Sequence, residues 1–153
     1  MARSNAALFW PVLVTVTAAD AATKALAQRH LPLPQLPHDV LGNAVRLTLV
    51  YNPGAAFGIS FGVYSRWIFM GLTMVALLIL ARLYAQTRPG HVARTLALAL
   101  VCGGALGNLV DRLRSGLGVV DFIDVGLRTA RWPTFNVADM AVTVGALLLA
   151  AVL

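Results

Sequence analysis

Two aspartates in the second half of the sequence have the residue type and the surroundings that acid–base chemistry requires. Asp121 lies inside the apolar run VVDFID, and Asp139 lies in FNVADM, where a long apolar stretch begins. Two carboxylates held close together cannot both ionise easily, so they share a proton. One can then act as general base on water while the other protonates a carbonyl oxygen, which is the aspartic-protease pattern. The same pair also suits proton-coupled transport, and Asp139 alone also suits the first turn of a helix.

The acidic residues as a group favour fixed roles over surface solvation. The sequence has six acidic residues and no Glu among them, whereas a solvated surface would use both acids freely. We therefore expect many of them to hold fixed positions. They are Asp20, Asp39, Asp111, Asp121, Asp124 and Asp139.

Other catalytic chemistries find little support in the sequence. Cys102 is the single cysteine and lies in an apolar run, which favours a small core residue over a nucleophile. The three histidines, at positions 30, 38 and 91, show no metal-ligand spacing, and no Ser-His-Asp arrangement is apparent. We predict no metal and no cofactor.

The elements that must position the aspartates are membrane spans. The chain is 59% hydrophobic and 12% charged, whereas a soluble domain has about 25% charged residues. The net charge of +6 comes from basic residues scattered among apolar runs, which suits anionic lipid headgroups and not nucleic acid. A bilayer-spanning helix needs about 20 apolar residues. Four stretches fit, at about residues 7–27, 67–85, 92–110 and 137–153.

The first stretch also resembles a secretory signal peptide with an Ala-rich cleavage site, AADAA. Its length and the pair Asp20 and Lys24, spaced four apart on one helical face, favour a retained helix with a polar stripe. Four spans place segments 28–66 and 111–136 on one side of the membrane, and all six acidic residues lie on or near that side.

The segment between the first two spans contains the Pro-rich LPLPQLP and the strand-like VRLTLVY, Val45 to Tyr51. We predict one domain over residues 1–153, an all-α membrane protein with four transmembrane helices and a small β-sheet on the membrane surface. We also expect about Pro32 to Ser65, with its apolar GAAFGISFG run, to form a mobile cover that contacts substrate.

The third span ends in GGALGNLVDRL. Asn108, Asp111 and Arg112 share one helical face there, and Gly103 and Gly107 form a GxxxG pair that lets a neighbouring helix approach closely. For Asp111 and Arg112, orienting the site and direct chemistry are both open. Asn136, three residues before Asp139, suits a helix N-cap.

Five segments of the chain resemble the lipoprotein signal peptidases of bacteria, the type II signal peptidases. They occur in the family's order from the first span to the last, and together they are highly specific. The segments are DAATK (20–24), YNPGAAFG (51–58), GGALGNLVDRL (103–113), VVDFID (119–124) and FNVADMAVTVG (135–145). The family's usual basic tail after the last span is absent, so the native protein can extend beyond Leu153.

The resemblance implies an inner-membrane enzyme with both termini cytoplasmic and a catalytic aspartate dyad near the extracytoplasmic surface. It implies cleavage of the signal-peptide helix from diacylglyceryl-modified prolipoproteins, just before the lipidated cysteine, with membrane lipid as the second partner. Motif matching gives the dyad as Asp121 and Asp139. The polar positions that line the substrate site are Asn52, Asn108, Arg112 and Asn136, and the positions that we expect to support it are Asp20, Lys24, Asp111 and Ala138.

Two other functions compete with the peptidase. A small proton- or ion-coupled transporter would use the same carboxylates, but transporters often show paired repeats and interrupted spans near the midplane. We see no such repeat, and the acids cluster at one face. A non-catalytic assembly subunit built on GxxxG contacts would leave that clustering unexplained.

Overall fold

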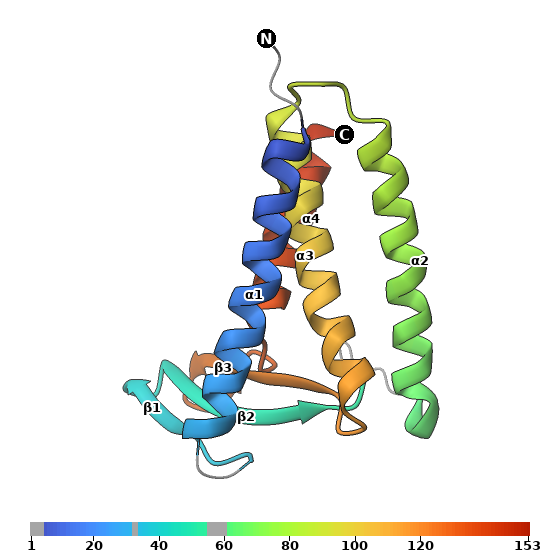
Figure 1. Cartoon of the computed structure of the whole chain (residues 1–153). Coiled ribbons are helices and arrows are strands. Elements are labelled where there is room, and N and C mark those ends of the chain that lie inside the picture. The colour runs from blue at the N-terminus through green and yellow to red at the C-terminus, as the bar shows by residue number, and fades with distance from the viewer. Residues whose placement is uncertain (1–4, 32–33, 55–60) are drawn as a thin grey trace.

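The computed structural model describes residues 5–31, 34–54 and 61–153 of the chain. It consists of a helix bundle with a small sheet across one end (Figure 1). Pro32, Leu33 and residues 55–60, which belong to the predicted cover, lie outside the described residues. The four long helices are α1 (Ala6–His30), α2 (Ser65–Ala85), α3 (Val92–Arg114) and α4 (Val137–Val152).

Helices occur at all four predicted positions, and three of them are long and apolar enough to cross a membrane: α1, α2 with the preceding 3-10 turn η1 (Gly62–Tyr64), and α3. Helix α4 is equally apolar in character but has 16 residues. Helix α3 continues to Arg114, so Asp111 and Arg112 lie in its last turns. The helices leave large apolar side chains exposed along their length, as expected of a multi-pass membrane protein.

Helix α3 is the centre of the bundle, with α1 and α4 packed against it and α2 standing further away (Figure 1). The predicted close approach at Gly103 and Gly107 is to α1. A Cβ at Gly103 would lie 2.9 Å from the Val16 side chain, and one at Gly107 would lie 2.5 Å from the Asp20 carboxylate. Gly104 faces α4, where a Cβ would collide with the carbonyl oxygen of Ala138. Small residues on two faces of α3 thus hold α1 and α4 at short range.

The sheet is antiparallel, in the order β1-β2-β3-β4. Its strands are β1 (His38–Leu41), β2 (Val45–Asn52), β3 (Val119–Leu127) and β4 (Ala130–Arg131). Strand β2 is the predicted VRLTLVY strand with one residue added. Strand β3 contains VVDFID, for which the sequence did not predict a strand. Its β-branched and aromatic residues are typical of a strand that is buried on both faces.

Apolar contacts fasten the sheet to the bundle. Ala27 and Leu31 at the end of α1 pack with Leu49 of β2 and with Val120 and Phe122 of β3. Helix α1 begins and α4 ends at the opposite end of the bundle (Figure 1). The sheet therefore meets the last turns of α1 and α3 and the first turn of α4, where the polar motifs occur.

Candidate functional site

Asp121 points from strand β3 into the interior, where its side chain has polar neighbours. The residue is 3% exposed. Its Oδ1 accepts a hydrogen bond from Asn136 Nδ2 at 2.7 Å, and its Oδ2 accepts one from Asn52 Nδ2 at 3.4 Å. The antiparallel register pairs Val50 with Asp121 and Asn52 with Val119, so Asn52 is a diagonal neighbour on the same face of the sheet.

Asp139 lies in the first turn of α4, where it also takes part in the helix cap. Asn136 Oδ1 accepts from the Asp139 backbone N at 2.8 Å, and Asp139 Oδ2 accepts from the Asn136 backbone N at 3.2 Å. This reciprocal capping box confirms the predicted N-cap role of Asn136. The other oxygen of Asp139, Oδ1, accepts from Asn108 Nδ2 of α3 at 2.8 Å.

Asn136 brings the two aspartates together. Backbone hydrogen bonds between Phe135 and Ile123 place the start of α4 beside β3. The Asn136 side chain, which is 0% exposed, then donates to Asp121, to Asn108 Oδ1 at 3.1 Å and to the carbonyl of Val120. The buried Asn136 amide thus donates directly to Asp121 and also donates to Asn108, which in turn donates to Asp139.

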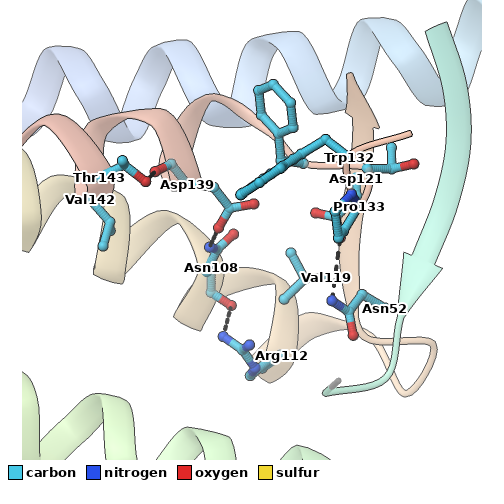
Figure 2. A pocket seen from close by; sticks show the side chains of 12 residues that line it. Asn52, Asn108, Arg112, Val119, Asp121, Trp132, Pro133, Asp139, Val142 and Thr143 are labelled. Carbon is cyan, nitrogen blue, oxygen red and sulfur yellow. Dashed lines mark hydrogen bonds between the residues drawn. The ribbon is translucent and has the colours of Figure 1, made fainter. Parts of the chain in front are cut away.

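Both aspartates line a cavity of about 330 Å³ (Figure 2). Asn52, Asn108 and Arg112 line it too, whereas Asn136 lies behind it. Arg112 donates to the backbone oxygen of Asn108 at 3.3 Å and interacts electrostatically with both aspartates. The cavity therefore combines a carboxylate pair, two amides and a positive charge.

Several lining residues were not singled out from the sequence. Val142 and Thr143 lie three and four residues after Asp139, so helical spacing alone places them on its face, and Thr143 Oγ1 donates to the Asp139 carbonyl at 2.8 Å. The others belong to β3 or to the connection between β4 and α4, and no sequence signal identified them. They are Val119, Trp132, Pro133, Thr134 and Phe135.

The surroundings of Asp121 raise the pKa of its carboxyl to about 7. Burial contributes most, because it penalises the charged form, and the negative charge of Asp139 adds to it. The hydrogen bonds from Asn52 and Asn136 and the positive charge of Lys24 act in the opposite direction. At neutral pH the pair can therefore hold a proton on Asp121.

The four expected supporting residues meet directly behind the aspartates. Lys24 Nζ lies 2.7 Å from Asp20 Oδ2 and 2.8 Å from Asp111 Oδ2, which confirms the predicted pairing of Asp20 with Lys24 on one helical face. Asp20 Oδ1 accepts from the backbone N of Ala138 at 2.9 Å. The four residues thus connect helices α1, α3 and α4.

The remaining two acidic residues lie away from the cavity. Asp124, three residues after Asp121, accepts from Thr48 Oγ1 at 3.0 Å and from Arg131 Nε at 2.5 Å within the sheet. Asp39 is 65% exposed, with Arg46 at 3.8 Å. Among residues 5–31, 34–54 and 61–153, no group of three or more His, Cys, Asp or Glu side chains could hold a metal ion.

Comparisons with known proteins identify the family to which the chain belongs. The family model "Signal peptidase (SPase) II" matches residues 12–153. A lipoprotein signal peptidase of Syntrophotalea carbinolica is 47% identical over 88% of this chain and 83% of its own. One from Moorella thermoacetica is 40% identical over 92% of this chain and 89% of its own.

The fold is also found among solved structures. A bacterial membrane enzyme solved by the in meso method at 2.3 Å resolution superposes with a TM-score of 0.81, at 30% identity, over 92% of this chain and 84% of that one. A second such structure, at 1.9 Å resolution, has a TM-score of 0.80 and the same identity. With the family model matched from the first helix to the last, the chain belongs to the signal peptidase II family.

Proposed function

We propose that the chain is an intramembrane aspartyl endopeptidase that removes the signal peptide from diacylglyceryl-modified prolipoproteins, cutting just before the lipidated cysteine. The family makes it a peptidase of lipoprotein processing. The observation that carries the catalytic type is the convergence of Asp121 and Asp139 on one cavity, with a shared proton favoured by burial. No metal or cofactor is part of the proposal.

The two aspartates differ in a way that assigns their first roles. Both accept two side-chain hydrogen bonds, but Asp139 lies in the first turn of a helix, where the dipole favours a negative charge. It is the general base. Asp121, with its pKa of about 7, holds the proton and is the general acid.

The reaction then follows the general chemistry of a carboxylate pair. Asp139 takes a proton from water as the water oxygen bonds to the scissile carbonyl carbon, and Asp121 gives its proton to the carbonyl oxygen. The gem-diol that forms collapses when Asp139 passes its proton to the leaving amine and the C–N bond breaks. Asp121 regains its proton from the diol hydroxyl, so the pair returns to its starting state.

The neighbouring polar groups suit binding of an extended peptide. Asn52, Asn108 and Arg112 line the cavity and offer amide and guanidinium donors to peptide carbonyls. Asn136 is buried and already satisfied by protein groups, so its contacts favour orienting the aspartates over touching substrate.

We further propose four crossings of the bacterial inner membrane, with both termini cytoplasmic and the sheet on the extracytoplasmic surface. Helix α4, at 16 residues, is about 24 Å long by its rise per residue, somewhat less than a hydrocarbon core of about 30 Å. Because Asp139 lies in its first turn, the cleavage site falls near the interface, where water and a lipid-anchored substrate both have access.

The proposal is tested by a gel-shift cleavage assay of purified protein with a diacylated prolipoprotein. We expect Asp121→Asn and Asp139→Asn each to lower the cleavage rate about 10³-fold or more, because each removes an acid–base partner. Asp39→Asn is the matched control, since that carboxylate is exposed and away from the cavity. Activity should also persist in EDTA.

Near-normal turnover by either folded dyad variant would show that the pair is misassigned. A wild-type protein that leaves the prolipoprotein intact, but moves protons or ions across vesicles, would favour the transporter instead.

A further inference from the structure

Lys24 is the only lysine of the sequence, and its ammonium lies buried between helices α1 and α3. It is 3% exposed and has three oxygen neighbours: Asp20 Oδ2 at 2.7 Å, Asp111 Oδ2 at 2.8 Å and Asn108 Oδ1 at 2.9 Å. An ammonium has three N–H donors and no acceptor, so these contacts use its whole capacity. A planar guanidinium would not reproduce three such diverging bonds.

Each of these three residues also makes a hydrogen bond to Asp121, to Asp139 or to the residue directly before one of them. Asp20 accepts from the backbone N of Ala138, the residue before Asp139. Asp111 accepts from the backbone N of Val120, the residue before Asp121, at 3.1 Å. Two of the contacts therefore hold the backbone N–H of the residue directly before each aspartate.

The third contact sets the orientation of an amide. Asn108 turns its oxygen to the Lys24 ammonium and its NH₂ to Asp139 Oδ1. The flipped orientation would put the NH₂ against the Lys24 ammonium and the Asn136 NH₂, and the amide oxygen against a carboxylate, so these contacts would become repulsive. Lys24 thus acts together with Asn136 to make Asn108 present a hydrogen-bond donor to Asp139.

We propose that Lys24 is a positioning residue for the aspartate pair, holding the peptide units before Asp121 and Asp139 and locking the Asn108 amide with its NH₂ toward Asp139. This rests on the proposed assignment of the two aspartates. Lys24 itself does not line the cavity that they share, so it acts through Asn108, Asp20 and Asp111 without contacting substrate.

Lys24→Met tests the role because it keeps the length of the side chain and removes the ammonium. We expect kcat to fall about 100-fold, the cost of a misplacement of about 1 Å, with a smaller change in KM, because Asn108 is the lining residue that loses its contact with Lys24. Arg29→Met, at an exposed position of the same helix, is the matched control and should keep the wild-type kcat.

A double variant separates positioning from folding. Lys24→Met alone leaves the buried Asp20 and the partly buried Asp111 without their cation, which destabilises the fold. Asp20→Asn with Lys24→Met leaves one carboxylate, and so keeps the charge of the cluster at −1 (one Lys against two Asp before, one Asp after). The new Asn can still accept from Ala138 N. We expect this double variant to fold like the wild type, as judged by thermal unfolding, and to stay about 100-fold slow.

Asp20→Asn alone retains the contact between Lys24 and Asn108, so it should cleave faster than the double variant. A folded Lys24→Met or double variant with the wild-type kcat would overturn the inference, as would an effect confined to KM. A double variant that does not fold would overturn the charge-balance argument. The outcome for the dyad variants is independent, because normal cleavage by Asp121→Asn or Asp139→Asn refutes the proposed function whatever Lys24 does.

Discussion

Asp121 and Asp139 have the same side chain, and their different neighbours determine which of the two carboxylates carries a shared proton. Asp121 is enclosed by a sheet and by apolar residues, with amide donors at 2.7 and 3.4 Å, while Asp139 has the start of a helix behind it. Because Asn52 donates to Asp121 from a neighbouring strand, this contact tunes the acid without touching the base. It gives a means of testing the assignment by pH.

We predict that Asn52→Ala shifts the alkaline fall of kcat to higher pH. Asp121 acts in its protonated form, so activity falls as pH rises through its pKa of about 7. The Asn52 hydrogen bond favours the ionised form, and its removal raises this pKa further. The measurement is the pH–rate profile under saturating substrate. Gln28→Ala, at an exposed amide that donates to Tyr51, is the control.

A profile whose alkaline limb stays in place in Asn52→Ala, or moves to lower pH, would contradict the assignment of Asp121 as the acid.

At this scale, the sequence was sufficient to find the aspartates and insufficient to describe how they are held. An Asp within VVDFID and an Asp in the first turn of an apolar helix are local patterns. The bridging position of Asn136 and the amide orientation of Asn108 depend on three separate elements meeting, which no local pattern contains. From the sequence, the list of site residues could have been extended only to residues at helical spacing from a predicted one, such as Thr143, four residues after Asp139.

At the scale of elements, strand β3 presents two aspartates with different duties. Asp121 and Asp124 are three residues apart, so they project to opposite faces of the strand. Asp124 is bonded to Thr48 of β2 and to Arg131 of β4, and Arg131 continues to Asn43 Oδ1 at 3.0 Å. This cluster ties three of the four strands together and has no contact with the cavity.

We predict that Asp124→Asn lowers stability more than catalysis. The variant weakens a charge-assisted bond to Arg131, which costs about 1–3 kcal/mol of unfolding free energy for a buried partner. Its cleavage rate at a temperature well below its Tm should stay near that of the wild type. Thermal unfolding and the gel-shift assay, run in parallel with Asp121→Asn, distinguish the two duties. Equal losses of activity would contradict the division.

Strand β3 also shows why one element was missed. Its alternation is masked because both faces are buried near Asp121, so it resembles an apolar loop as much as a strand. Strand β2 was found because its pattern stands between clear turn signals. The apolar span predicted at about 92–110 covers most of helix α3, which continues through Asp111 and Arg112 to Arg114, where α1 supplies Lys24 to pair with Asp111.

At the scale of the whole molecule, the sheet lies across one end of the bundle (Figure 1). The acidic residues and the cavity belong to this sheet and to the turns of α1, α3 and α4 nearest to it. Arg82, Arg88 and Arg94 lie at the other end, around the connection between α2 and α3. Short loops dense in Lys and Arg are typical of the cytoplasmic side. The density of Arg around this short connection therefore favours the proposed orientation, while the much longer connections at the other end hold more Lys and Arg by count.

We predict that a membrane-impermeant maleimide labels Leu117→Cys from outside intact cells and labels Arg88→Cys only after the membrane is opened. Leu117 is 61% exposed in the connection from α3 to β3, and Arg88 is exposed in the connection from α2 to α3. We expect no labelling of the native Cys102, because it is buried. Labelling in the reverse pattern would place the sheet in the cytoplasm.

The cluster that joins α1, α3 and α4 through Lys24 and Asp20 has a consequence for biosynthesis. Asp139 belongs to α4, the last helix to leave the ribosome, while the groups that hold its backbone and its amide partner come from α1 and α3. A nascent chain with three helices inserted has neither the base nor the Ala138 N–H that completes the Asp20 contact. With the proposed assignment of the two aspartates, proteolytic competence arises only with the final insertion step.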